Sequence, residues 1–195
     1  MSGGTTNALV RRLRQPMLFS TRYFVGAAID IGAGSDSLEL QRVFWPRLTS
    51  VRSWDKADGD ARCMEGLPRE SFDLCYSSHC LEHIHTPWLA LSIWWDLVRP
   101  GGYLVVVVPD EDLYEQGVWP STFNSDHKHT FTVWKRESWS PVSLSALDLV
   151  RILNGSDVVK VERIEEGFNP ALPRCDQTAL SGSESCIEFI VRKPG

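Results

Sequence analysis

The chain has 195 residues, a net charge of −5 and a pI near 5.5, and these values exclude several classes of protein. The length fits one domain with a real hydrophobic core. The acidic balance gives no basic field for nucleic acid or an anionic membrane, and no apolar run approaches the roughly 20 residues of a membrane span. We therefore expect a single domain over residues 1–195, with no membrane partner and with nucleic acid disfavoured.

The first 29 residues carry four arginines and no acidic residue. This composition is compatible with an organelle-targeting segment. We favour a basic N-terminal helical segment over residues 1–23, whose first helix runs from about Thr6 to Gln15 and ends at Pro16. In this interpretation the arginines point into water and the inward residues are Leu9, Val10 and Leu13.

A short apolar strand at about Val25 to Ile31 runs into a glycine turn, Gly32-Ala33-Gly34, and then into a helix from Ser37 to Val43. Strand, glycine turn and helix form the opening unit of many nucleotide sites. Glycines serve there because a Cβ would block close approach of the backbone to a ligand. Asp30, at the strand end, is placed to accept hydrogen bonds from cationic or hydroxyl groups of that ligand.

The ligand at this turn is better described as an adenosine with a cationic or zwitterionic tail than as a dinucleotide. Asp36 stands where a third glycine would fall, and a carboxylate at a helix start opposes a bound phosphate.

Strands and helices alternate through the rest of the chain, which predicts a doubly wound α/β sheet. Further strands are predicted at Leu48–Asp55, Ser71–Ser78, Tyr103–Val108, Asp157–Glu166 and Cys186–Lys193, and helices at Pro87–Val98 and Ser143–Leu153. Residues 57–64 form a short turn and possible third strand, and no crossover helix fits before them. Residues 111–139 and 167–185 lack clear periodicity and are expected to be loops.

The predicted strand ends bring the candidate ligand contacts to one edge, because ligands of an open parallel sheet bind beyond the carboxyl ends of its strands. Acids close two successive strands, and a carboxylate there can accept both hydroxyls of a ribose. The candidates at this edge are Asp30, Gly32, Gly34, Asp55, Asp60, Ala61, Ser77, Ser78, His79, Asp110 and Asp112.

Three stretches, AIDIGAGSDS, GDARCMEGLPRESFDLCYSSHCLEHI and WDLVRPGGYLVVVVPDED, resemble the class I S-adenosylmethionine-dependent methyltransferases over about Phe24 to Asp112. The LPRESFD and LEHI pieces joined to RPGG are more specific than the glycine turn. The resemblance implies a Rossmann-like, mostly parallel sheet in the order 3-2-1-4-5-7-6 with an antiparallel last strand, here shortened between strands 2 and 3.

The resemblance also implies S-adenosyl-L-methionine as cofactor and assigns roles by position. Asp30, Gly32, Ala33 and Gly34 would hold the methionine part, and Asp55 the ribose hydroxyls. Asp60 and Ala61 would border the adenine, and Ser78 and His79 would lie under the sulfonium. The substitution at Asp36 and the missing helix before Asp60 are departures from the family pattern.

The histidines offer candidates for a metal ligand and for a base. His79 and His83 are four residues apart, a spacing that suits metal ligands on a helix, but we favour local packing of the LEH turn and expect no metal. His127 and His129 lie in the 111–139 loop, which in this fold covers the transferable methyl group. A neutral histidine there can take a proton from a hydroxyl. The alternative is that these histidine side chains only pack against nearby aromatic rings.

Asp110, with Asp112 and Tyr114, competes for the role of base or for orienting the substrate. We expect residues 167–185 to join residues 111–139 in walling the acceptor pocket, with polar contacts from Arg174, Asp176 and Gln177.

The preferred function is that of an enzyme that methylates a small polar molecule, by O-methylation of a sugar or related metabolite. The sugar is suggested by family members associated with glycan biosynthesis that share the shortened form. Two alternatives stay open: a non-catalytic, cofactor-binding partner subunit, and a nucleic-acid methyltransferase. Five cysteines, odd in number and without C-x-x-C spacing, favour a cytoplasmic location. The sequence leaves the oligomeric state open.

Overall fold

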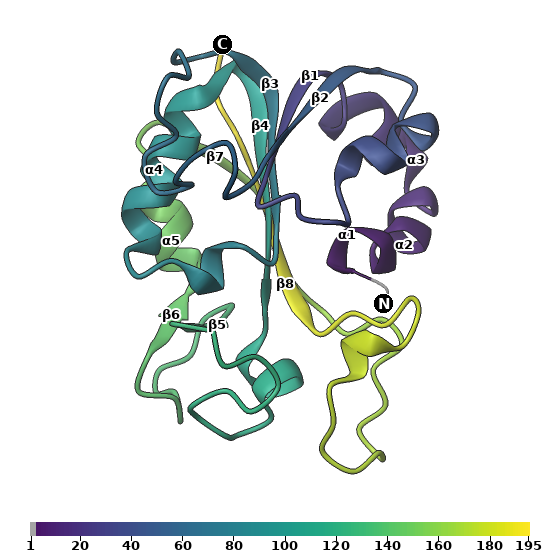
Figure 1. The fold of residues 1–195 in the computed structure, drawn as a ribbon, viewed down its shortest axis with the longest axis vertical. Coiled ribbons are helices and arrows are strands. Elements are labelled where there is room, and N and C mark those ends of the chain that lie inside the picture. Colours follow the sequence, from purple (N-terminus) through teal and green to yellow (C-terminus); the bar gives the residue numbers. More distant parts are fainter. Residues whose placement is uncertain (1–2) are drawn as a thin grey trace.

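A computed structural model describes residues 3–195, which form one main β-sheet with helices on both faces (Figure 1). The sheet has six strands in the order β2-β1-β3-β4-β8-β7. The strands are β1 Gly26–Ile31, β2 Leu48–Trp54, β3 Phe72–Ser78, β4 Val98–Pro109, β7 Asp157–Ile164 and β8 Cys186–Arg192. Neighbours from β2 to β4 are parallel, and β8 is antiparallel to both β4 and β7. The predicted α/β class and the antiparallel last strand are confirmed.

The extra edge strand of the expected seven-stranded order is replaced by turns in residues 55–71. This stretch has no alternating apolar pattern, and Gly59 and Gly66 turn the backbone with φ of +138° and +79°. The indole Nε1 of Trp94 donates to the carbonyl of Ala61 over 2.8 Å, and Met64 packs into the core. The possible strand at 57–64 is therefore wrong, and β2 forms the edge of the sheet.

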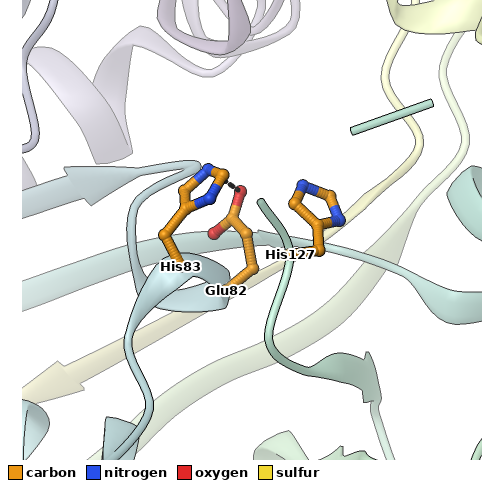
Figure 2. Close-up of side chains that lie close together, drawn as sticks. All are labelled: Glu82, His83 and His127. Atoms are coloured by element: carbon orange, nitrogen blue, oxygen red, sulfur yellow. Dashed lines mark ion pairs between the residues drawn. The ribbon is translucent and has the colours of Figure 1, made fainter. Parts of the chain in front are cut away.

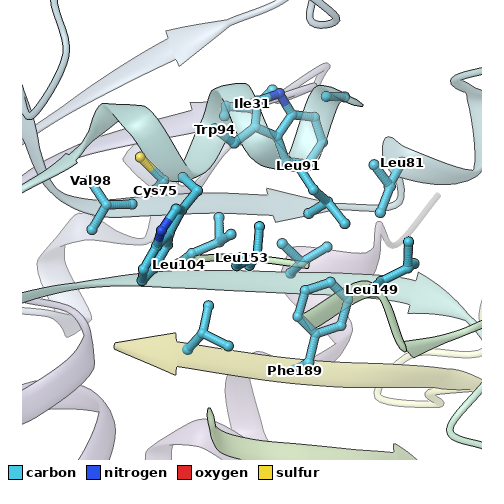
Figure 3. Packing of buried hydrophobic residues seen from close by; sticks show 14 of the residues in the cluster. Ile31, Cys75, Leu81, Leu91, Trp94, Val98, Leu104, Leu149, Leu153 and Phe189 are labelled. Atoms are coloured by element: carbon cyan, nitrogen blue, oxygen red, sulfur yellow. The ribbon is translucent and has the colours of Figure 1, made fainter. Parts of the chain in front are cut away.

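One face of the sheet is covered by α4 (Pro87–Leu97) and α5 (Ala146–Arg151). Leu91 and Trp94 of α4 belong to the main hydrophobic cluster, together with Cys75, Leu104 and Phe189 from three strands (Figure 3). Strand β4 reads as an unbroken apolar run because both of its faces are covered. It begins at Val98, earlier than the predicted Tyr103.

The opposite face carries the N-terminal helices and an aromatic cluster (Figure 1). The elements are α1 Gly4–Asn7, α2 Leu9–Leu13, α3 Pro16–Leu18, the π-helix η1 Phe19–Tyr23 and the 3-10 helix η2 Leu38–Phe44. The predicted helix from Thr6 to Gln15 is thus two short helices, and the one predicted from Ser37 to Val43 is a 3-10 helix. Phe24 packs edge-on against Trp45 and Tyr76, with ring centroids 4.9 and 5.8 Å apart.

The prediction that the N-terminal arginines face water is wrong for Arg11 and Arg12, which are buried, whereas Val10 and Leu13 are exposed. Arg11 pairs with Glu184 and Glu188 over 2.7 and 3.1 Å, and Arg12 pairs with Glu188 over 2.8 Å. Lys160 reaches the same glutamate over 2.9 Å. We call these five residues the N-terminal ion network. It fixes the helices to β8, because buried charges need partners.

The remaining elements lie beyond the carboxyl ends of the parallel strands or at the edges of the sheet. They are the 3-10 helix η3 Leu81–His83, the π-helix η4 Glu111–Glu115, the paired strands β5 Thr130–Thr132 and β6 Ser143–Ser145, and the 3-10 helix η5 Gln177–Ala179. Strand β6 takes the first residues of the predicted helix Ser143–Leu153, so that helix starts at Ala146.

Within residues 3–195, every helix is too short or too polar to cross a membrane.

Candidate active site

A cleft of about 850 Å³ opens at the carboxyl ends of β1, β2 and β3. Five of the nine residues predicted to bind the cofactor line it, namely Gly32, Asp55, Asp60, Ala61 and His79. These residues come from the first glycine turn, from the segment after β2 and from the end of β3, which the parallel strands bring to one edge. We call this space the cofactor cleft.

Gly32 satisfies two backbone requirements at the mouth of the cleft. Its φ is +77°, in the left-handed region that favours glycine. A Cβ at this position would lie 2.6 Å from the sulfur of Cys80. The turn after β1 therefore needs glycine both for its conformation and for its contact with the end of β3.

Asp55 and Asp60 lie on the exposed wall of the cleft. Asp55 holds its own turn, since its Oδ1 accepts from the amide of Lys56 over 2.8 Å. Asp60 pairs with Arg62 over 2.6 Å, and the hydrogen bonds from Arg62 lower the pKa of Asp60. Asp60 is thus held in its ionised form, and both carboxylates are accessible to ligand hydroxyl or amino groups.

Four other predicted cofactor residues, Asp30, Ala33, Gly34 and Ser78, do not line the cleft. The carboxylate of Asp30 is 2% exposed and accepts from the amide of Leu38 over 2.7 Å, so it fixes the start of η2. Burial raises its pKa to about 6. Ser78 has a buried hydroxyl, and among the described residues it has no hydrogen-bond partner.

The N-terminal segment occupies the space beside the glycine turn. Asp36, which departs from the family pattern, accepts from the amide and the hydroxyl of Thr6. A Cβ at Gly4 would lie 2.2 Å from the ring of His79 and 2.9 Å from the hydroxyl of Ser78. The carboxylate of Asp36 therefore has a structural role, which is to hold Thr6. A turn that binds phosphate would not carry a carboxylate at this position.

A second cavity of about 220 Å³ adjoins the cleft, with His79, His83 and Asn124 lining both. Both segments predicted to lie on the substrate side contribute to it, through Tyr114, Asn124 and His127 from the first and through Thr178 and residues 183–185 from the second. We call it the inner cavity. Its position beside the cofactor cleft is the one expected of an acceptor pocket.

The polar contacts expected from the second segment are made elsewhere. Arg174 donates to the carbonyl of Glu115 over 2.8 Å and lies 4.2 Å from the ring centre of Phe123, so it ties the two segments together. Asp176 caps η5, and Gln177 hydrogen-bonds Asn169. None of the three lines the inner cavity.

The three candidate bases have different surroundings. His127 lines the inner cavity, and its Nδ1 lies 2.7 Å from the buried carboxylate of Glu115. His129 lines neither described cavity, and its Nε2 donates to the carbonyl of His85 over 3.2 Å. Asp110 is buried, caps η4 through the amides of Asp112 and Leu113, and has its pKa raised to about 6 by burial. Only His127 faces the inner cavity.

Glu82, His83 and His127 form a group that the sequence did not reveal as one (Figure 2). One ligand-type atom from each lies within 4.8 Å of the others. We call these three residues the histidine cluster. Burial would raise the pKa of Glu82, but the hydrogen bond from His79 and the nearby imidazoles outweigh it and lower that pKa. The LEH motif pointed to two members, whereas His127 and its partner Glu115 gave no periodic signal.

His79 stands between the cleft and this cluster. Its φ of +53° is rare for a residue with a side chain, and such conformations cost of order 1–3 kcal/mol and gather at functional sites. Its Nδ1 lies 3.4 Å from Glu82 Oε1. The turn after β3 thus directs the ring toward the point where the two cavities meet.

Comparison with known proteins agrees with this geometry. Residues 27–106 match the family model described as "Methyltransferase domain". A methyltransferase from Archaeoglobus fulgidus described as SAM-dependent is similar at 18% identity, with a TM-score of 0.63 and coverage of 96% of this chain and 94% of that one. The sequence matches no curated protein.

Two further solved structures have the same fold. A protein from Bacillus halodurans described as a putative methyltransferase is 13% identical, with a TM-score of 0.60 and coverage of 94% and 99% of the two chains. The 1,6-didemethyltoxoflavin-N1-methyltransferase of Burkholderia thailandensis, solved with S-adenosylhomocysteine, is 16% identical, with a TM-score of 0.58 and coverage of 98% and 80%. At these identities the likeness establishes the fold.

Residues 27–106 thus match a methyltransferase domain, and the sheet has the fold of the class I, S-adenosylmethionine-dependent methyltransferases. This confirms the resemblance seen in the sequence. The cofactor that the domain implies is S-adenosylmethionine, and the residues of the cleft fit it. Carboxylates stand on the wall where ribose hydroxyls would bind, and a glycine turn and His79 stand at the mouth.

Proposed function

We propose that this protein is an enzyme that transfers a methyl group from S-adenosylmethionine to a hydroxyl of a small polar molecule, a sugar or a related metabolite. The cofactor would lie in the cofactor cleft, with Asp55 on the ribose and Asp60 and Ala61 at the adenine. The acceptor would enter the inner cavity.

The observation that carries this proposal is the arrangement of His127 and Glu115 at the inner cavity, which adjoins the cofactor cleft. Both side chains are buried, and their 2.7 Å contact holds the imidazole with Nδ1 on the carboxylate. A carboxylate that accepts from one ring nitrogen leaves the other nitrogen as a proton acceptor. The pair thus supplies an oriented histidine in the cavity next to the cofactor.

The reaction needs alignment and one proton acceptor. When bound, S-adenosylmethionine would supply a methyl group on a positively charged sulfur, and the acceptor oxygen would take this methyl group with a neutral thioether left behind. The hydroxyl proton passes to Nε2 of His127. Since the cofactor brings the activated carbon, the protein mainly positions the reactants.

The lining of the inner cavity supports a polar acceptor. It includes Asn124 and Thr178 besides His127, and Tyr114 adds an aromatic residue. Such groups recognise hydroxyl-rich molecules by hydrogen bonds and by packing on a ring. The volume of about 220 Å³ favours a small molecule over a polymer.

The burial of Arg11 and Arg12 supports a small-molecule acceptor over nucleic acid. These arginines were the main basic cluster of the sequence, and both are paired with glutamates inside the domain. They are therefore not available as a phosphate-binding track. A cytoplasmic location belongs to the same proposal and rests on the five cysteines, which are free thiols.

Two measurements test the proposal. Calorimetry with S-adenosylhomocysteine should show binding to the cofactor cleft. Methyl transfer from labelled S-adenosylmethionine to a panel of sugars and nucleotide sugars should show turnover that falls in His127→Ala with cofactor affinity unchanged. The exposed Arg151 provides a control variant, Arg151→Ala, with normal turnover. Binding of the cofactor product without transfer to any hydroxyl compound would instead support a non-catalytic partner subunit.

A further inference from the structure

Two histidines and a glutamate meet at the wall shared by the two cavities. Glu82 and His83 belong to η3 after strand β3, and His127 comes from the loop that follows η4. Figure 2 shows the carboxylate of Glu82 between the two imidazole rings. We propose that this histidine cluster binds a divalent transition-metal ion. Its role in activating the acceptor hydroxyl rests on the function proposed above.

Both imidazoles are oriented as metal ligands are. The Nδ1 of His83 lies 3.2 Å from the carboxylate of Asp126, and its Nε2 lies on the side of Glu82, 3.9 Å from Oε1. The Nδ1 of His127 is taken by Glu115. Metal-bound histidines almost always donate their other ring N–H to a carboxylate, a carbonyl or water. Each histidine here has that second partner, which leaves its Nε2 as the donor atom.

The carboxylate of Glu82 is buried with one of its oxygens unpaired, and a bound cation would explain this arrangement. The side chain is 1% exposed, and among the described residues its Oε2 has no hydrogen-bond partner. Its other oxygen lies near His79 and His83. A buried oxygen without a partner costs free energy comparable to a lost hydrogen bond. A bound cation would supply the missing partner.

The cluster is held by backbone contacts as well as by its side chains. The amide of Lys128 donates to the carbonyl of Glu82 over 2.8 Å, and the amide of His129 approaches the same oxygen at 3.4 Å. The chain next to His127 is thus fixed to the LEH turn. Preorganised ligands need little rearrangement on binding, which is a requirement of a functional site.

The donor set favours one class of ion. Imidazole suits zinc, iron, nickel and copper, whereas magnesium and calcium prefer oxygen ligands. Three protein ligands leave at least one position for a further group, the arrangement of catalytic rather than structural zinc sites. That position would face the inner cavity, which His83, Glu82 and His127 all line. A hydroxyl bound there would be polarised and would lose its proton to water in the cavity, so in the metal-bound protein the ion replaces Nε2 of His127, which is then a ligand, as the group that activates the hydroxyl.

The test uses the full chain after treatment with a chelator. Cobalt(II), added alone, should bind at one site per chain and give visible d–d absorption, and zinc should displace it in calorimetry. His83→Ala and His127→Ala should each weaken cobalt binding by roughly 100-fold or more, because each removes a ligand. Glu115→Gln, which changes the partner of a ligand, should weaken it about 10- to 100-fold.

His85→Ala is the matched control, because His85 is exposed, close in sequence and outside the cluster. It should bind cobalt as the wild type does. His83 is 28% exposed, so its replacement is the variant least expected to disturb folding, and circular dichroism checks this. The proposal is overturned if cobalt fails to bind the folded wild type. It is equally overturned if His83→Ala and His127→Ala bind cobalt as well as His85→Ala does.

Binding of S-adenosylhomocysteine, measured on the same samples, separates this proposal from the proposed function. Cobalt binding that depends on the cluster, in a chain that does not bind S-adenosylhomocysteine, would support the metal site and refute the methyltransferase reaction. Cofactor binding and sugar methylation that both survive in the chelated protein, without cobalt binding, would refute the metal site and support the reaction.

Discussion

Two groups of buried charges lie on different parts of this domain, and they differ in whether their polar atoms are satisfied. In the N-terminal ion network, Glu188 contacts Arg11, Arg12 and Lys160. The Arg12 guanidinium also lies 5.1 to 5.6 Å from the centres of three aromatic rings. In the histidine cluster and its partner Glu115, one carboxylate oxygen of each glutamate has no hydrogen-bond partner among the described residues.

The difference is the one expected between a structural group and a group with the ligand-binding role proposed above. A buried charge that is paired on every side holds elements together and has no capacity left for a ligand. A buried carboxylate with a free oxygen, next to a cavity, retains that capacity at a cost in stability. Loss of a charge should therefore destabilise the first group strongly and the second only slightly.

The largest expected effect is on the N-terminal ion network. Glu188→Gln should lower the free energy of unfolding by roughly 3–5 kcal/mol, because it leaves buried cations without their counter-charge. Urea denaturation measures this. Glu162→Gln is the control, since that glutamate contacts Lys160 from the surface. A loss below about 1 kcal/mol for Glu188→Gln would show that the network is not structural.

A second test concerns Asp30, a third buried charge, at the end of β1. Burial raises its pKa to about 6 from an ordinary 3.8. Between these two pH values the folded state keeps the proton of the carboxyl group, whereas the unfolded state has released it. The stability that this proton provides is complete below about pH 4 and is lost as the pH rises to about 6. The change is about 3 kcal/mol at most, at 1.36 kcal/mol per pKa unit. Asp30→Asn should remove it in denaturation curves recorded between those pH values, and an unchanged pH dependence would contradict the shift.

A third test addresses the open side of the site. Asp55→Ala should weaken S-adenosylhomocysteine binding by about 10- to 100-fold, the value of a hydrogen-bonded charge of roughly 1.5–3 kcal/mol. Because Asp55 is exposed, thermal stability should stay close to that of the wild type. Calorimetry checks the affinity, with Glu65→Ala as a nearby acidic control, since Glu65 is exposed and lies outside the residues lining the cleft. Equal affinity in the two variants would place the ribose elsewhere.

The smallest expected effect on stability sharpens the comparison most. Glu82→Gln should lower the free energy of unfolding by only about 1 kcal/mol, because the imidazoles that hold the pKa of Glu82 down lose their charged partner while one of its two oxygens has no hydrogen bond to lose. Methyl transfer to the acceptor should fall at least about tenfold. A loss of stability as large as that of Glu188→Gln, with turnover retained, would make the two groups alike.

The sequence determined the order of strands from β1 to β4, the two final strands and the glycine turn, because apolar runs bounded by Gly, Pro and acidic residues specify local elements. It also determined that Gly32, Asp55, Asp60, Ala61 and His79 would share one edge, since parallel strands end together. The absence of the edge strand was predicted only in part. The sequence showed that the crossover helix is missing, but it did not show that β2 becomes the edge of the sheet.

Only the tertiary structure decided which charges are buried and which side chains meet. The helical pattern of residues 9–13 predicted that the leucines face the core. Arg11 and Arg12 are buried instead, because they form ion pairs with Glu184 and Glu188, which belong to a segment far away in the sequence. His127 joins Glu82 and His83 in the same way, across 44 residues of sequence. Local patterns report hydrophobic burial, whereas the pairing of charges and the meeting of ligands depend on contacts between segments far apart in the chain.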